Sequence, residues 1–238
     1  MKYHGTWTAA AALLALAACS PKPAPETKAE APALPAVVSA EGDFATNLQT
    51  ALIEAKPGDT VRLPEGVFNL TTGLSLDVDG VTLLGAGQDK TILDFAGQTG
   101  AGEGLLVTSD NVTLMAFGIR DTKGDGIKSK GADGITYRDL TVDWSGEPDE
   151  GNGAYGVYPV ESRDVLAEFN VAGIEIENSN NADVYGNIAR DNTGGILVFD
   201  LPDLPVIGGH STRIFNNQIV HNNTRNFAPA GNIVAGVP

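Results

Sequence analysis

The stretch that decides the fold is Val171-Ala172-Gly173-Ile174-Glu175-Ile176-Glu177-Asn178-Ser179, and a related stretch, Gly195-Ile196-Leu197-Val198, follows it. Short alternating runs of this kind, bounded by Gly and Asn, predict strands with one buried face. Ile174 and Ile196 lie 22 residues apart. A unit of that length is too short for a strand–helix pair but long enough for three short strands, and it must stack on its neighbours to bury its apolar side. The repeat therefore predicts a parallel β-helix.

Two sets of strands recur along the chain. The first set is expected to begin at Val81, Val112, Ile135, Val165, Asp183 and Arg213. The second set comprises Leu105-Leu106-Val107, Gly126-Ile127-Lys128, Gly156-Val157-Tyr158, Gly173-Ile174-Glu175, Gly195-Ile196-Leu197 and Asn232-Ile233-Val234. Inserts at 145–153 and 201–211 explain the longest intervals. The interval from Val157 to Ile174 is only 17 residues, which leaves open a contracted coil or a lost one.

The N-terminal part of the repeat domain predicts a helix. Phe44, Leu48 and Leu52 lie at helical spacing, and Lys56-Pro57-Gly58-Asp59 ends the pattern. An amphipathic helix here would cover the apolar end of the first coil. No such element is predicted before Pro238, so an open strand edge is expected at that end. Either a truncated chain or a binding partner would account for it.

Three segments are predicted. Residues 1–18 resemble a signal peptide that ends in the lipobox Leu16-Ala17-Ala18-Cys19, so Cys19, the only cysteine, is expected to be lipidated. Residues 19–40 form a Pro- and Ala-rich tether, and residues 41–238 form the β-helix domain. Ser20, after the cysteine, favours the outer membrane, facing the periplasm or the cell surface.

The composition narrows the classes of ligand. The net charge is −15, and no basic cluster offsets it, so nucleic-acid binding is excluded. An anionic glycan would meet the same repulsion unless a cation such as Ca²⁺ bridged the two charges.

The runs "AKPGDTVRLPEGVF" and "VTLLGAGQDKTILDF" resemble the opening coils of right-handed parallel β-helix proteins, the superfamily of pectate lyases, polygalacturonases and mannuronan C5-epimerases. Together with the lipobox, the tether and "AGIEIENSNNADVYGN", they are most similar to bacterial parallel β-helix lipoproteins with no assigned activity. That resemblance implies a cell-envelope location and a second exported protein as a partner.

The residues expected to carry catalysis are Glu175, Glu177 and Asp125. Strand alternation places Ile174 and Ile176 inward and both glutamates outward, about 7 Å apart at Cα. Such a pair suits an inverting glycosidase, and it also suits Ca²⁺, which prefers several oxygen ligands. The alternative is that both are solvated charges on a strand.

Residues on neighbouring coils would form a ladder with these acids, because coils stack about 4.8 Å apart. The candidate substrate-binding residues are Lys128, Tyr155, Tyr158, Arg190, Asp200 and His210. The tyrosines suit sugar stacking, or simply cover the sheet. The paired aspartates of polygalacturonases and the Asp-Pro-His run of the epimerases are absent. The resemblance therefore carries no catalytic residue onto this chain.

The sequence thus predicts an all-β, right-handed parallel β-helix with a capping helix, exported and anchored by lipid. We expect it to bind or modify a polysaccharide, as a lyase, C5-epimerase or glycoside hydrolase would. The alternative is a non-enzymatic envelope scaffold that binds a partner protein through its flat face or open edge.

Overall fold

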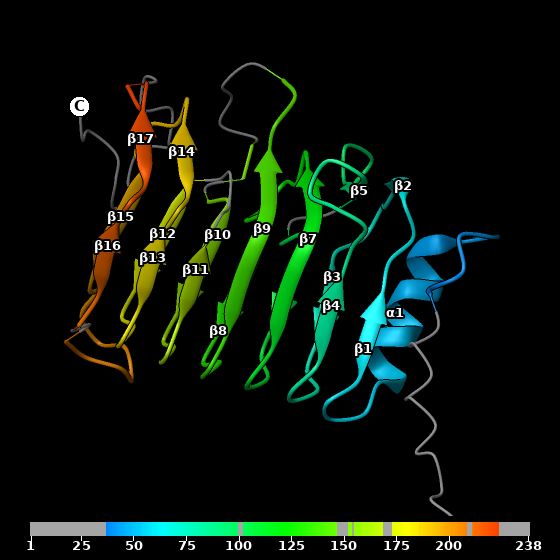
Figure 1. Ribbon diagram of the computed structural model, residues 1–238, viewed down its shortest axis with the longest axis horizontal. Coiled ribbons are helices and arrows are strands. Elements are labelled where there is room, and N and C mark those ends of the chain that lie inside the picture. The colour runs from blue at the N-terminus through cyan, green and yellow to red at the C-terminus, as the bar shows by residue number, and fades with distance from the viewer. Residues whose placement is uncertain are drawn as a thin grey trace, which may run out of the picture. The chain divides into compact units, whose positions relative to one another are not determined.

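The computed structural model describes residues 37–99, 102–146, 152–153, 155–168, 173–208 and 211–223. The described strands pair in parallel, each with the strand one coil further along the chain, and they stack into a right-handed parallel β-helix (Figure 1). The predicted fold class is confirmed. Within the described residues, no helix has the length and apolar character needed to cross a membrane.

The strands form three sheets. The longest sheet contains β1 (Thr60–Arg62), β4 (Thr82–Leu84), β7 (Thr113–Arg120), β9 (Thr136–Asp143), β11 (Leu166–Glu168), β13 (Asp183–Tyr185) and β16 (Arg213–Phe215), joined by β2 (Gly66–Asn69) and β5 (Thr91–Asp94). The second sheet contains β3 (Leu74–Leu76), β6 (Leu105–Val107), β8 (Ile127–Lys130), β10 (Val157–Val160), β12 (Ile174–Glu177) and β15 (Ile196–Phe199). The third contains β14 (Ile188–Arg190) and β17 (Gln218–Val220). The second sheet carries the site described below and is called the site sheet.

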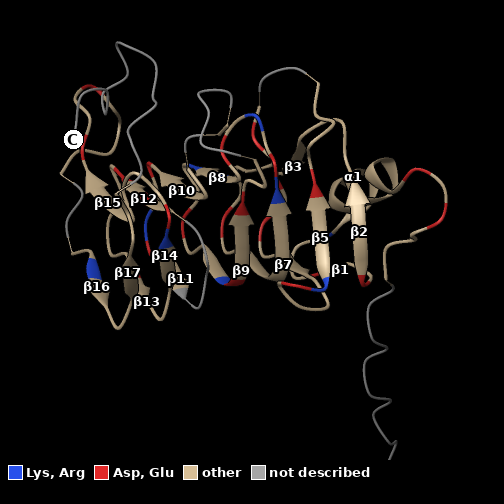
Figure 2. Ribbon diagram, turned by 90° about the horizontal axis from the view of Figure 1, so that it is seen from above, with Lys and Arg blue, Asp and Glu red and all other residues tan. Residues whose placement is uncertain are grey.

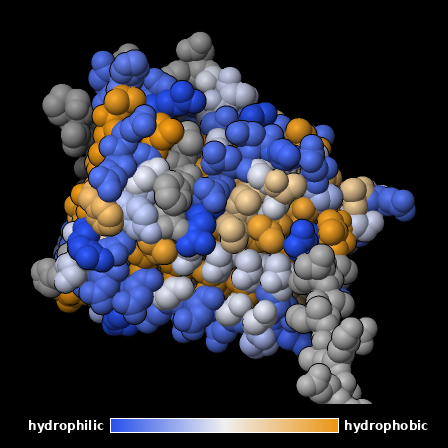
Figure 3. All heavy atoms as spheres, in the orientation of Figure 1, coloured by the Kyte–Doolittle hydropathy of each residue, from blue (hydrophilic) through white to orange (hydrophobic). Residues whose placement is uncertain are grey.

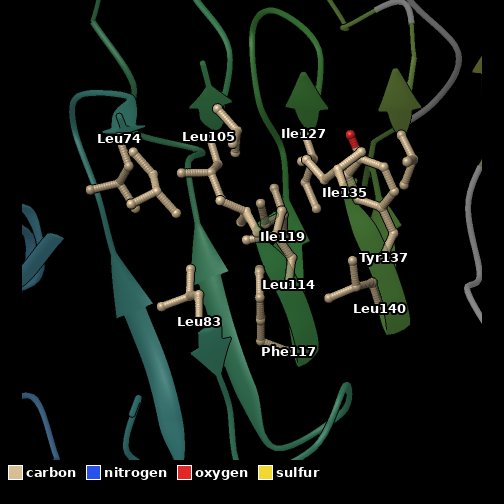
Figure 4. Packing of buried hydrophobic residues seen from close by; sticks show 14 of the residues in the cluster. Leu74, Leu83, Leu105, Leu114, Phe117, Ile119, Ile127, Ile135, Tyr137 and Leu140 are labelled. Carbon is tan, nitrogen blue, oxygen red and sulfur yellow. The ribbon is translucent and has the colours of Figure 1, made fainter. Parts of the chain in front are cut away.

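The core consists of inward side chains stacked coil upon coil. On the site sheet, Leu105 pairs with Leu74 and Ile127, and Ile174 pairs with Ile196. Figure 4 shows the first three residues pointing into the core from successive strands. Because every coil places an apolar residue at the same register position, each covers the apolar side of the next. The predicted stacking of Ile174 on Ile196 is confirmed, and Ile174 is 2% exposed.

A helix covers the N-terminal end of the stack. α1 spans Phe44–Glu54, and Asp43 caps it by accepting hydrogen bonds from the backbone of Ala45 and Thr46. The helix buries Phe44, Leu48 and Leu52. Figure 1 places it beside β1 at one end of the molecule. The predicted capping helix is confirmed.

Asparagines stack at the coil corners. The Asn187 amide donates to the Asn217 side chain at 3.0 Å, and Asn192 does the same to Asn222 at 3.1 Å. Asn187, Asn217 and Asn222 each also donate to a carbonyl of the coil before them, as Asn217 does to Val184 at 2.8 Å. These bonds satisfy backbone groups that the turns would otherwise leave unpaired.

The tether was predicted to reach residue 40; in the structure Val38 is buried and its backbone donates to the carbonyl of Arg62. The short coil keeps both of its strands in register, since β11 pairs with β9 and β13, and β12 pairs with β10 and β15. It is therefore a contracted coil. Residues 1–36 and the strand expected at 232–234 lie outside the described residues.

Candidate functional site

The site lies on the outer face of the site sheet, where three successive strands carry polar side chains. Lys128 of β8 is in register with Tyr158 of β10. The next strand, β12, presents Glu175 and Glu177 outward, because Ile174 and Ile176 belong to the core. The sequence placed these residues on one ladder, and the structure brings them together.

Glu175 differs most from an ordinary surface glutamate, because it is completely buried. Its side chain is 0% exposed, and neither carboxyl oxygen accepts a hydrogen bond of normal geometry, although the Tyr155 hydroxyl lies near enough to interact with it. Burial raises its pKa from 4.5 to about 8; the hydroxyl of Tyr155 offsets part of that rise, while Glu177 and Asp125 add to it. The group therefore holds its proton at neutral pH. The interpretation of the two glutamates as solvated charges is wrong, since Glu177 is also only 4% exposed.

Two tyrosines border the glutamates. The Tyr158 hydroxyl donates to Oε2 of Glu177 at 2.6 Å. The rings of Tyr155 and Tyr158 meet at a tilt, with 4.8 Å between their centroids. Burial, with the neighbouring acids second, raises the pKa of both phenols, so each keeps its proton and remains a hydrogen-bond donor.

Lys128 lies on the other side of Tyr158. Its Nζ is 3.5 Å from Oδ2 of Asp125, 3.6 Å from Oε1 of Glu103 and 4.8 Å from the centroid of the Tyr158 ring. Desolvation raises the pKa of Asp125, Glu103 adds to the rise, and Lys128 opposes it. The ammonium group is therefore shared between two acids and an aromatic face.

The sequence did not single out Glu103. It precedes Gly104 at the start of β6, just as Asp125 precedes Gly126 at the start of β8. That repeated acid–glycine pair, one coil apart, is the signal that could have found it. The register of β6 with β8 then brings both acids to the same ammonium group.

Other predicted site residues lie elsewhere. Arg190 ends β14, which belongs to the third sheet and not to the site sheet, so its predicted place beside the glutamates is wrong. Asp200 is exposed and follows β15, the last described strand of the site sheet. His210 lies outside the described residues.

The insert after β15 is held beside the site by Asn178, the residue after Glu177. The Asn178 amide donates to the carbonyls of Leu201 and Val206, at 3.0 and 2.7 Å, and its oxygen accepts from the Leu201 backbone at 2.8 Å. Its side chain is completely buried. Asn178 thus fixes the described start of the insert at the end of β12.

Among the described residues, the structure adds no third His, Cys, Asp or Glu ligand to the Ca²⁺ site predicted at Glu175 and Glu177. In the described ranges, no three His, Cys, Asp or Glu side chains are grouped so that they could hold a metal ion. Glu177 already accepts from Tyr158, and Glu175 carries a proton at neutral pH. Calcium binding by this pair stays a prediction.

The buried carboxyl of Glu175 makes stability depend on pH. The unfolded chain loses this proton near pH 4.5, whereas the folded chain keeps it to about pH 8, so the folded state binds more protons in that window. We therefore expect the free energy of unfolding to fall as the pH rises from 4.5 to 8, by at most about 1.4 kcal/mol per pH unit from this group. Denaturant titrations of wild type and Glu175→Gln measure the difference. An equal pH dependence in both proteins would contradict the raised pKa.

One of three comparisons with known proteins found a similar protein, and it supports the fold. No family model matches the chain, and no curated protein matches it. Among solved structures, the A-module of the Azotobacter vinelandii mannuronan C-5 epimerase AlgE4 is similar, with a TM-score of 0.50 and 21% sequence identity. The match covers 66% of this chain and 50% of that one, so the chain spans about half the length of its neighbour. This likeness supports the parallel β-helix fold and does not extend to function.

Proposed function

We propose that this protein modifies a polysaccharide bound along the site sheet, with Glu175 as its proton-transfer group. The observation that carries the proposal is the Glu175 carboxyl, which is fully buried on the outer face of a sheet, accepts no hydrogen bond of normal geometry and has a pKa near 8. A carboxylic acid that holds its proton at neutral pH is suited to general acid catalysis. Burying an ionisable carboxyl among other ionisable groups lowers the stability of a protein, and this arrangement is typical of a functional site.

The neighbouring groups supply the other requirements of glycan chemistry. Asp125 and Glu177 are carboxyl groups of the kind that act with an acid in glycoside hydrolysis. The rings of Tyr155 and Tyr158 offer apolar faces and hydroxyl donors to a sugar. The structural neighbour named as a mannuronan C-5 epimerase supports a polysaccharide-modifying role on this fold.

Access to Glu175 requires a local movement. The side chain has no exposed surface in the free protein, so a sugar reaches the carboxyl only when a neighbour is displaced. Tyr155 is partly exposed and interacts with Glu175, which makes it the side chain expected to move. Binding energy from other sugar units would offset the cost of that movement.

The reaction class is decided by the products. The purified protein is incubated with neutral, amino and acidic polysaccharides, and new reducing ends, unsaturated products and changed stereochemistry at C5 are measured. Reducing ends alone indicate hydrolysis, unsaturated products indicate elimination, and inverted C5 centres indicate epimerisation. If no polysaccharide is bound or changed, the proposal is refuted.

A second candidate, a scaffold that binds a partner protein, is favoured by the last described coil. Ile214 and Phe215 of β16 and Ile219 and Val220 of β17 are 41–50% exposed. Figure 3 shows hydrophobic atoms on the surface over these strands. Pull-down with a second exported protein would support this role, and it would be independent of Glu175.

Export and lipid anchoring are part of the proposal and rest on the lipobox that ends at Cys19. We expect Cys19→Ser to move the protein from the membrane fraction to the soluble fraction of its host cell, because the thiol that carries the lipid is removed. Fractionation and immunoblotting measure this shift. Unchanged sedimentation with membranes would exclude the anchor.

A further inference from the structure

One ammonium group is already bound on the outer face of the site sheet. The Lys128 ammonium lies between Asp125 and Glu103 and over the ring of Tyr158. Two carboxyl groups and an aromatic face therefore suffice, in this protein, to hold a primary ammonium ion. Such an arrangement combines ion pairing with attraction to the ring quadrupole.

The next coil repeats the carboxyl groups and the aromatic ring, but its described residues supply no cation of their own on this face, and the positive charge that acts on Glu175 is that of Lys128 from β8. Glu175 and Glu177 project from β12 beside Tyr155 and Tyr158. Among the ion pairs of the described residues, none includes either glutamate. The following strand cannot supply the cation, because it places Leu197 and Phe199 at the register positions of the two glutamates.

The buried oxygens of Glu175 indicate a missing hydrogen-bond partner, and if that partner is a cation it favours the ionised carboxylate and donates to it. Both are buried without a hydrogen bond of normal geometry, which costs stability. An ammonium ion can donate three hydrogen bonds, and its positive charge would balance the negative charge of ionised carboxyl groups. The rings of Tyr155 and Tyr158 lie beside the two glutamates, and aromatic faces attract cations.

We propose that the Glu175–Glu177 pair binds the protonated amino group of an amino sugar, so that the substrate is a polysaccharide with free amino groups. The proposal rests on the proposed function and narrows it to one class of glycan. A uronate polymer is disfavoured, because its carboxylate would meet Glu103, Asp125 and Glu177, and Lys128 is already shared by two of these acids. Figure 2 shows Lys and Arg scattered along the described coils.

The test is calorimetric titration with three oligosaccharide series at mildly acidic pH, with EDTA present. The series are oligomers of glucosamine, the same oligomers fully N-acetylated, and oligogalacturonate. We expect glucosamine oligomers to bind at least about tenfold more tightly than either of the others, which is the effect of one charged contact. Added salt should weaken this binding, since screening reduces the attraction.

Glutamine substitutions test whether the two glutamates contact the amino group of the sugar. Glu177→Gln and Glu175→Gln should each weaken binding of glucosamine oligomers by about tenfold or more while leaving the N-acetylated series unchanged. Glu65→Gln is the matched control, because Glu65 is exposed on the turn before β2 and its change removes the same charge. That variant should bind as wild type does.

The number of protons released on binding gives an independent test. An ammonium group beside Glu175 favours the ionised carboxyl, so binding should release a proton at neutral pH. Titrations in two buffers with different ionisation enthalpies measure this release, which Glu175→Gln should abolish. A bound uronate would instead favour the protonated form and release nothing.

The outcomes separate this inference from the proposed function. Equal binding of glucosamine and N-acetylated oligomers, or tighter binding of oligogalacturonate with or without added Ca²⁺, would overturn the amino-sugar proposal and keep a polysaccharide role. Binding that the glutamine variants do not alter would overturn it as well. No binding by any saccharide would refute the proposed function itself.

Discussion

We expect Glu175→Gln to lower the turnover of the polysaccharide substrate by about 10²–10⁴-fold, the usual contribution of a general acid or base. Glutamine has nearly the same shape but cannot transfer a proton, so the packing of the side chain is kept. The measurement is the initial rate at saturating substrate, together with circular dichroism to verify folding.

The pH profile tests the same role in the wild-type protein. If protonated Glu175 is the acid, turnover should decrease as the pH rises through about 8, where its carboxyl ionises. The residual activity of Glu175→Gln should lack that limb of the profile. Glu65→Gln serves as the control and should retain the wild-type rate. A Glu175→Gln protein with the full rate would leave Glu175 as a buried group without a catalytic role.

The second large effect is on stability. We expect Ile174→Ala to lower the free energy of unfolding by about 2–5 kcal/mol, because it removes a buried side chain and leaves a cavity in the stack. Ile174 lies between Val157 and Ile196 in the inward column, so no neighbour can fill the space without breaking register. Denaturant titration monitored by circular dichroism measures the loss.

Ile53→Ala is the matched control for this substitution. Ile53 lies on α1 and is 64% exposed, so the same chemical change should alter stability by no more than about 0.5 kcal/mol. Similar losses at both positions would show that the Ile174 cost does not arise from the core. A loss at Ile174 as small as that expected for Ile53 would place the β12 side chains on the opposite faces.

Much of the fold followed from the local pattern of residues. The Gly-Ile-x-Ile strands and the helical spacing of Phe44, Leu48 and Leu52 each predict an element that the structure confirms. Strand alternation also predicted that Glu175 and Glu177 project away from the core, and the repeat placed them near Lys128 and the tyrosines. These features depend on the periodicity of apolar residues and on the stacking of repeats, and both can be recognised in the order of residues along the chain.

The environment of those side chains was decided only by the tertiary structure. Alternation says which face a glutamate occupies, but not what lies over that face, so the burial of Glu175 and its raised pKa could not be predicted. The contact of Glu103 with Lys128 depends on the register between coils, and Arg190 belongs to a different sheet because the chain turns a corner after β13. Burial and pKa are set by residues that are distant in sequence and close in space, and a local pattern does not specify which residues those are.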